Sequence, residues 1–305
     1  MNRLTFPLLM AFLMCCSGVV WGHDLPPVLV LGQDDNGMGS SDAASSGVIH
    51  GDVLRLRPLM RPAEVLESMP GMVVTQHSGD GKANQYFLRG MSLDHGTDFA
   101  TSVNGVPINL PSHGHGHGYS DLNSLIPELV TEIRYRKGPY FASEGDFASA
   151  GSAQIVYRTQ IERPFVTTSW GQGGYLRVLA AGSQSVGDGL TLLSAVERVN
   201  QNGPWTTPEG LRKLNALFTL GSGSGRESWS TSLSAYSASW NATDQIPQRL
   251  IDAGRYRGQA FGRYDSLDPS DGAQTQRLSL SGQWQRHAQN QLSAVQWYAV
   301  RYDLA

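Results

Sequence analysis

The second half of the chain alternates polar and apolar residues, and this pattern restricts the fold more than any other feature. From residue 165 onward the side chains change character with a period of two, which is typical of β-strands that present two different faces. Between residues 277 and 285, polar side chains occupy the odd positions and mostly apolar ones the even positions. The pattern predicts seven strands. They lie near residues 164–170, 175–185, 190–199, 213–220, 228–240, 274–286 and 291–302.

The connections between these strands alternate in length after the first pair. Long links at 200–212 and 241–273 are separated by short ones, as in outer-membrane barrels with short periplasmic turns and longer external loops. Residue 165 would then lie on the periplasmic side. A soluble β-sandwich shows similar alternation, but it does not need aromatic residues near strand ends, where the girdles of membrane barrels lie. The candidates for these girdles are Trp170, Tyr175, Trp240 and Tyr302.

Composition excludes some classes of protein without choosing among the rest. Charged residues make up 16% of the chain and its formal net charge is −3, so a basic stripe for nucleic acid is absent. After residue 22 no apolar run reaches the length of a membrane helix. A secreted all-β protein and an outer-membrane barrel are both compatible with these values. Barrel strands alternate apolar and polar residues, so that the overall composition of a barrel is average.

The first 22 residues predict an export signal that is removed. Arg3 precedes a mostly apolar stretch at 4–14, and Gly22 ends a small-residue pattern that signal peptidase accepts. Cys15 and Cys16 raise the alternative of a lipoprotein, but neither follows the small residue that lipidation needs. Cleavage near Gly22 removes both cysteines, so we expect no disulfide in the mature protein.

Short motifs between residues 62 and 138 predict a mixed α/β region. Pro62 favours a helix start at residues 62–68, Pro70-Gly71 ends it, and Asn104-Gly105 marks a turn. We expect strands at 72–75, 86–88, 99–103, 130–136 and 154–159, and a helix at 122–129 interrupted by Pro127. The motifs are Pro62-Ala-Glu-Val-Leu-Glu-Ser-Met-Pro70-Gly71, Asn84-Gln-Tyr-Phe-Leu88-Arg89-Gly90, Val103-Asn-Gly105-Val-Pro107 and Ile126-Pro127-Glu128-Leu-Val-Thr-Glu132.

Taken together, these motifs resemble the plug domain of TonB-dependent outer-membrane receptors. One departure is the segment that follows Gly138-Pro139, where the family usually has a small-residue Tyr-Gly segment. The expected fold is an α+β plug followed by antiparallel transmembrane β-barrel strands. The expected division is a signal peptide at 1–22, a TonB box and linker at 23–47, the plug at 48–159 and the first barrel strands at 160–305.

The resemblance also implies a barrel of about twenty-two strands. Seven strands cannot close such a barrel, so we expect an incomplete barrel, either a fragment or a truncated product. The family partners are TonB with its inner-membrane ExbB–ExbD motor, outer-membrane lipid, and the barrel-assembly machinery during biogenesis. The expected location is the outer membrane of a Gram-negative cell, and no nucleic acid partner is expected.

The segment after the signal is similar to a TonB box. Two prolines and four β-prone apolar residues form an extended peptide that can add a strand to a sheet edge. The alternative is an edge strand of the first domain. The residues are Leu25, Pro26, Pro27, Val28, Leu29, Val30 and Leu31. The resemblance further implies that Arg89, Glu128 and Glu132 couple plug to barrel, whereas a purely structural salt bridge is the alternative.

Five of the eight histidines fall in one stretch, residues 77–117, and they predict contact with a metal ion or metal chelate. Neutral imidazole is the commonest metal ligand, and glycines alternate with three of these histidines. The histidines are His77, His95, His113, His115 and His117, the last three being candidate metal ligands. A flexible polar loop without a direct role is the alternative. The His-x-His start of a metallohydrolase signature is not continued, so we expect no enzyme activity.

We therefore expect active import of a scarce solute, with a metal ion or siderophore-like chelate as the favoured cargo and no required cofactor. The alternative is a truncated, non-transporting protein that binds TonB or other barrel components. The sequence does not name the cargo, because specificity lies largely in external loops.

Overall fold

The computed structural model describes residues 45–305 except 77–78, 112–117, 225, 243–244 and 289–290. The chain divides into two compact units, Met1–Asp34, which lies outside the described residues, and Asp35–Ala305, which contains all of them. The predicted signal peptide and TonB box lie outside the described residues, as do His77, His113, His115 and His117. No helix in the described part of the chain is long and apolar enough to cross a membrane.

Within its described residues, the predicted plug contains two small sheets and four short helices. In the five-stranded sheet, β5 and β8 are parallel and the other neighbours are antiparallel. Its order is β1 (Ser46–His50), β7 (Val130–Lys137), β8 (Gly151–Tyr157), β5 (Phe99–Val103), β6 (Val106–Pro107). The three-stranded sheet is β2 (Met72–Thr75), β3 (Gln85–Leu88), β4 (Met91–Ser92). The helices are α2 (Gly51–Arg55), η1 (Pro62–Ser68), η2 (Pro127–Leu129) and η3 (Ala142–Glu144).

Local sequence explains where η1 begins and ends. Pro62 takes the first helical position, where its missing N–H costs nothing, and Glu64 Oε2 accepts the Arg61 N–H at 3.1 Å. Gly71 follows with a φ of 85°, a conformation that glycine adopts without strain. The segment folds as a 3₁₀ helix, and it buries Val65 and Leu66 completely.

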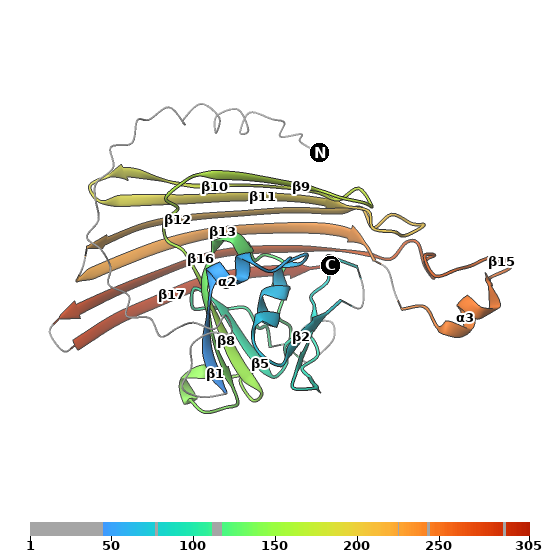
Figure 1. The fold of residues 1–305 in the computed structure, drawn as a ribbon, viewed down its shortest axis with the longest axis horizontal. Helices are drawn as coiled ribbons and strands as arrows, with labels where there is room; N and C mark the ends of the chain where they lie inside the picture. The colour runs from blue at the N-terminus through green and yellow to red at the C-terminus, as the bar shows by residue number, and fades with distance from the viewer. Residues whose placement is uncertain (1–44, 77–78, 112–117, 225, 243–244, 289–290) are drawn as a thin grey trace. The chain divides into compact units, whose positions relative to one another are not determined.

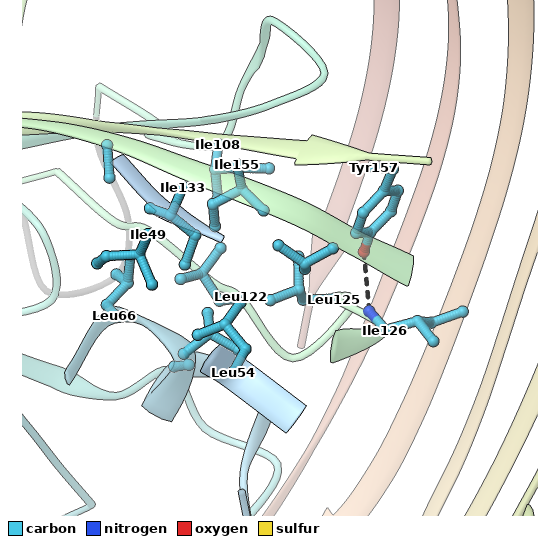
Figure 2. Packing of buried hydrophobic residues seen from close by; sticks show 14 of the residues in the cluster. Ile49, Leu54, Leu66, Ile108, Leu122, Leu125, Ile126, Ile133, Ile155 and Tyr157 are labelled. Carbon is cyan, nitrogen blue, oxygen red and sulfur yellow. Dashed lines mark hydrogen bonds between the residues drawn. The ribbon is translucent and has the colours of Figure 1, made fainter. Parts of the chain in front are cut away.

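A single apolar core holds these elements together. Figure 2 shows Ile49 of β1, Ile133 of β7 and Ile155 of β8 in the same cluster as Leu66 of η1. Each of these side chains is at most 1% exposed, and burying one stabilises the fold by about 1.5–3 kcal/mol. The strands of the main sheet and η1 are therefore joined by packing as well as by hydrogen bonds.

The second half of the described chain forms one antiparallel sheet in sequence order, as Figure 1 shows. Its strands are β9 (Phe165–Trp170), β10 (Leu176–Gly187), β11 (Leu190–Gln201), β12 (Leu211–Ser224), β13 (Glu227–Asn241), β16 (Gly272–Ala288) and β17 (Gln291–Leu304). All seven predicted strands are confirmed, and most run a few residues longer than predicted. The link between β13 and β16 holds α3 (Gln248–Ala253), β14 (Arg255–Tyr256) and β15 (Gln259–Ala260).

The two faces of this sheet differ as the alternation predicts. On β16, Arg277 and Ser279 are buried at 6% exposure, whereas Leu278 and Leu280 are 51% and 42% exposed. The polar row faces the predicted plug, because the Arg277 guanidinium donates to the Pro107 carbonyl at 3.3 Å. The apolar row lies on the opposite face.

Two local predictions are wrong. Residues 122–129 do not form an interrupted helix; only η2 (Pro127–Leu129) is helical, because Pro127 cannot donate the hydrogen bond that a longer helix needs. Trp240 and Tyr302 do not lie in a membrane-interface girdle. Trp240 is 6% exposed and packs against Gly81 of the predicted plug, and Tyr302 donates a hydrogen bond to Asp121.

Candidate functional site

Residues 119–128, hereafter the contact segment, make a continuous set of polar side-chain contacts between the predicted plug and the sheet. The segment lies between β6 and β7 in the chain, and before η2 it has no helix or strand apart from the isolated bridge of Tyr119 to Leu110. The Asp121 carboxylate accepts the Asn123 N–H at 2.9 Å, which fixes a local turn. Leu122 and Leu125 point into the apolar core. Polar side chains and backbone carbonyls of the segment are therefore left to contact the sheet.

The C-terminal end of the contact segment meets the sheet through a chain of ion pairs. Arg177 of β10 donates from Nη1 to Glu128 Oε1 at 2.5 Å and from Nη2 to Oε2 at 2.9 Å. Its Nε donates to Glu197 Oε1 of β11 at 2.6 Å. Lys213 Nζ of β12 lies 2.8 Å from Glu197 Oε2. Four charges thus alternate in sign across three strands, and the Arg177 pairing with Glu128 is bidentate.

The electrostatic balance at Glu128 favours the ionised carboxylate. Burial would raise the pKa of Glu128, but the hydrogen bonds and charge of Arg177, with a further contribution from Lys213, hold it below its ordinary value. The carboxylate is therefore charged at neutral pH, and the ion pair is present whenever plug and sheet are in contact.

The middle of the contact segment binds the sheet through its backbone carbonyl groups. Lys213 Nζ donates to the Asn123 carbonyl at 3.3 Å, and Asn215 Nδ2 donates to the Ser124 carbonyl at 2.6 Å. Carbonyl groups in an irregular buried segment have no ladder partner, so side chains from the sheet must satisfy them. Both donors come from β12, which makes this strand the central support of the segment.

The N-terminal end of the contact segment is a buried carboxylate with neutral donors. Asp121 is 5% exposed, and the Tyr302 hydroxyl of β17 donates to its Oδ2 at 3.1 Å. The Tyr119 ring meets the Tyr302 ring edge-on, with centroids 6.3 Å apart. Burial raises the pKa of Asp121, and the hydrogen bonds from Asn123 and Tyr302 and the charges of Arg277 and Lys213 offset this only in part.

Comparison with known proteins gives the family of the plug region and the fold of the chain. Residues 40–152 match the family described as TonB-dependent Receptor Plug Domain. The chain carries a TonB-dependent receptor plug domain. The receptor fold continues after the plug, because the sheet from β9 to β17 matches solved receptors together with it.

Three solved structures give the extent of this likeness. The ferric citrate transporter FecA is 14% identical, with a TM-score of 0.65 over 85% of this chain and 40% of its own. The ferric yersiniabactin uptake receptor FyuA from Yersinia pestis is 17% identical, with a TM-score of 0.62 over 87% and 43%. The siderophore receptor PiuA from Acinetobacter baumannii is 14% identical, with a TM-score of 0.61 over 85% and 37%. The chain thus spans about two fifths of these receptors, and the likeness concerns the fold.

The three predicted coupling residues occupy different places on the plug. Glu128 binds Arg177 of the sheet. Glu132 lies on β7 and pairs with Arg134 of the same strand at 2.5 Å. Arg89 is exposed in the turn between β3 and β4, and no ion pair joins it to an acid among the described residues. The structure does not bring these three residues together, and their role in coupling stays a prediction.

His95 is the one predicted metal-contact histidine that lies within the described residues. It is completely buried, its Nδ1 is 3.1 Å from the Asn84 carbonyl oxygen, and its ring lies 5.7 Å from that of Tyr119. Contact with an arriving solute would therefore require the plug to change conformation. Within the described part of the chain, no cluster of three or more His, Cys, Asp or Glu residues could hold a metal ion.

Sequence reasoning did not single out the sheet residues that complete this site, although the alternation contained a signal for them. Charged side chains at the inward positions of strands are costly unless a partner meets them. The alternation of inward and outward positions along the strands would therefore have been enough to identify these charged residues as needing partners. They are Arg177, Glu197, Lys213 and Arg277.

Proposed function

We propose that this chain is part of a TonB-dependent outer-membrane receptor that imports a scarce solute, with a metal ion or metal chelate as cargo. The observation that carries the proposal is a plug domain held by an ion pair and hydrogen bonds on the polar face of a sheet whose other face is apolar. Support for the cargo comes from FecA, FyuA and PiuA, which are receptors for ferric citrate, ferric yersiniabactin and a siderophore. The function is transport, and no covalent chemistry is proposed.

The proposed energy input is TonB, driven by its ExbB–ExbD motor, binding residues 25–31 by strand addition. The plug offers a path for a pull at this end. β1 is the edge strand of the plug sheet, and its five residues pair with β7 from Ser46↔Arg136 to His50↔Glu132. β7 begins two residues after Glu128. A displacement of β1 would thus act on the strand that carries Glu132 and directly follows the ion pair with Arg177.

The contact segment supplies the proposed coupling device. Its bidentate pair with Arg177 resists small displacements but can be exchanged for water once the plug moves, because Glu128 is still 30% exposed. Arg89 and Glu132 remain proposed coupling residues on the plug side. The outer membrane is the proposed location, with barrel-assembly machinery acting during biogenesis.

Uptake of iron-55 chelates by Gram-negative cells that produce the protein and lack their own iron-chelate receptors tests this proposal. We expect uptake of at least one chelate when TonB is present and none when it is absent. Leu29→Pro should abolish uptake, because proline removes a backbone donor that strand addition needs. Asp35→Pro in the neighbouring linker is the matched control and should transport normally. Equal uptake with and without TonB would contradict the proposal.

Titration calorimetry on the full chain tests the proposed cargo contact at the histidines. Zn²⁺, Cu²⁺, Ni²⁺ and ferric citrate would be titrated into the wild type and a His113/His115/His117→Ala variant. Saturable binding that the triple variant loses would support a metal-linked receptor. Binding that is equal in both proteins, or absent from both, would contradict a role of these histidines in cargo capture.

A non-transporting protein that binds TonB or other barrel components is the second candidate. Both candidates predict that the periplasmic domain of TonB binds the wild type and not Leu29→Pro. Binding of TonB without TonB-dependent uptake of any chelate would favour this second function.

A further inference from the structure

A second contact between plug and sheet lies away from the contact segment, at the plug turn formed by residues 79–82. The Lys82 N–H donates to the Gly79 carbonyl at 3.1 Å and closes this turn. Glu209, from the 202–210 loop between β11 and β12, is 2% exposed and accepts the Asp80 N–H through its Oε1. A buried carboxylate from one region thus holds a backbone donor from the other.

Close packing around the plug turn depends on its glycines. A Cβ atom at Gly81 would lie 2.1 Å from ring atoms of Trp240, and one at Gly79 would lie 2.5 Å from Glu209 Oε1. Both distances are far below van der Waals contact. Any side chain at Gly81 would therefore force the turn away from Trp240. The turn and Trp240 are packed so closely that no additional atom fits between them.

The charges at this contact are unbalanced. The Asp80 carboxylate has its own partners, because Arg61 Nε donates to Oδ1 at 3.3 Å and Gln201 Nε2 donates to Oδ2. Among the described residues, no Lys, Arg or His forms an ion pair with Glu209. Burial and then the charge of Asp80 raise the pKa of Glu209 to about 7, against the opposing effects of the Asp80 N–H and Arg61.

The 202–210 loop is also tied to the longer link between β13 and β16. The Thr206 N–H donates to the Tyr264 carbonyl at 2.9 Å, and the rings of Trp205 and Tyr264 lie 6.2 Å apart. The Asn241 N–H donates to the Glu209 carbonyl at the end of β13. A change at Glu209 therefore reaches both long loops, on the side that we predict to face outside the cell.

We propose that Glu209 and Asp80 form a proton-sensitive latch that holds the plug turn against the 202–210 loop and releases it as pH rises. The closed latch binds a proton more tightly than a solvent-exposed glutamate would, whose ordinary pKa is about 4.3. Protonation therefore favours the closed state. Closure is fully favoured in acid and weakens as pH rises through about 7, where Glu209 loses its proton close to Asp80. This latch does not depend on the identity of the cargo.

Hydrogen exchange at the Asp80 amide reports the latch directly, because this N–H is the donor to Glu209. Exchange would be measured on the full chain between about pH 5.5 and about pH 8.5 and corrected for the intrinsic effect of pH. We expect protection in the wild type to fall about tenfold across this range, with a midpoint near 7. Glu209→Gln, which cannot ionise, should stay protected throughout.

Three further variants make the outcome specific. Gly81→Ala should expose the amide at every pH, because it prevents closure against Trp240. Glu227→Gln, at an exposed carboxylate that accepts from Trp284 Nε1, should behave like the wild type. Asp80→Asn should move the midpoint to lower pH by removing the neighbouring charge. Wild-type protection that is independent of pH, or a midpoint that Asp80→Asn leaves unchanged, would overturn the latch.

Discussion

The two ends of the contact segment hold the plug against the sheet by different physical means. The Glu128 carboxylate pairs with the Arg177 guanidinium, which also pairs with Glu197, so that each charge has an opposite neighbour. At Asp121 the carboxylate is more deeply buried than that of Glu128, but it receives only an O–H and an N–H. Arg277 is near enough to influence Asp121, yet its guanidinium donates to a backbone carbonyl.

This difference shows why burial alone does not decide the charge of a side chain. Burial pushes the pKa of both carboxyl groups upward, and only at Glu128 do hydrogen bonds and opposite charge reverse the direction. One end of the segment is thus an ion pair that acid weakens. The other end is a contact that acid strengthens.

Arg177→Met should have the largest effect, because it leaves Glu197 buried at 1% exposure with Lys213 alone and leaves Glu128 unpaired. Removing one partner from a buried ion pair costs about 3–5 kcal/mol, which we expect as the loss in the free energy of unfolding. Urea denaturation of the full chain in detergent micelles measures it. Arg301→Met, at an exposed residue paired only with Asp303, is the control and should unfold like the wild type.

Glu128→Gln should have a smaller effect of the same sign. It removes one bidentate, charge-assisted pair but leaves Arg177 bound to Glu197, so we expect a loss of about 1.5–3 kcal/mol. The same denaturation measures it, with the exposed Glu162→Gln as the matched control. A loss no larger than that of the control would show that the pair with Arg177 does not hold the plug.

Asp121→Asn should stabilise the protein at high pH, reversing the sign seen at Glu128. A raised pKa means that the folded state loses stability as pH rises through it, and asparagine avoids that loss. We expect a gain of about 1 kcal/mol at alkaline pH, the ordinary scale of a point mutation, and no gain in acid. Denaturation midpoints across the pH range measure both values, and destabilisation at every pH would contradict the account.

The smallest expected effect is the loss of the free energy of unfolding of the wild type at acidic pH. The lowered pKa of Glu128 means that its contribution is fully present above the ordinary value, about 4.3, and is lost as pH falls below it. The wild type should therefore lose stability in this window more steeply than Glu128→Gln. Parallel curves for the two proteins would remove Glu128 from the acid response.

Strands and contacts were predictable from the sequence to different degrees. The strands follow from a local period of two, so β16 and its polar row could be read without knowing their partners. The conformation of the contact segment could not be predicted in this way. Its apolar residues have helical spacing, but the turn at Asp121 and the proline at position 127 prevent a helix. These apolar residues are Leu122, Leu125, Ile126 and Leu129. Trp240 was misplaced for a similar reason. Its partner, Gly81, lies far away in the chain, and no local pattern joins them.

The central claim, that the plug is held by an ion pair at one end of the contact segment and by neutral donors at the other, is tested most directly by two double-mutant cycles. One combines Glu128→Gln with Arg177→Met, and the other Asp121→Asn with Tyr302→Phe, each measured as the free energy of unfolding at neutral pH. We expect a coupling energy of about 2 kcal/mol or more in the first cycle and below about 0.5 kcal/mol in the second. Equal coupling energies in the two cycles would contradict the account.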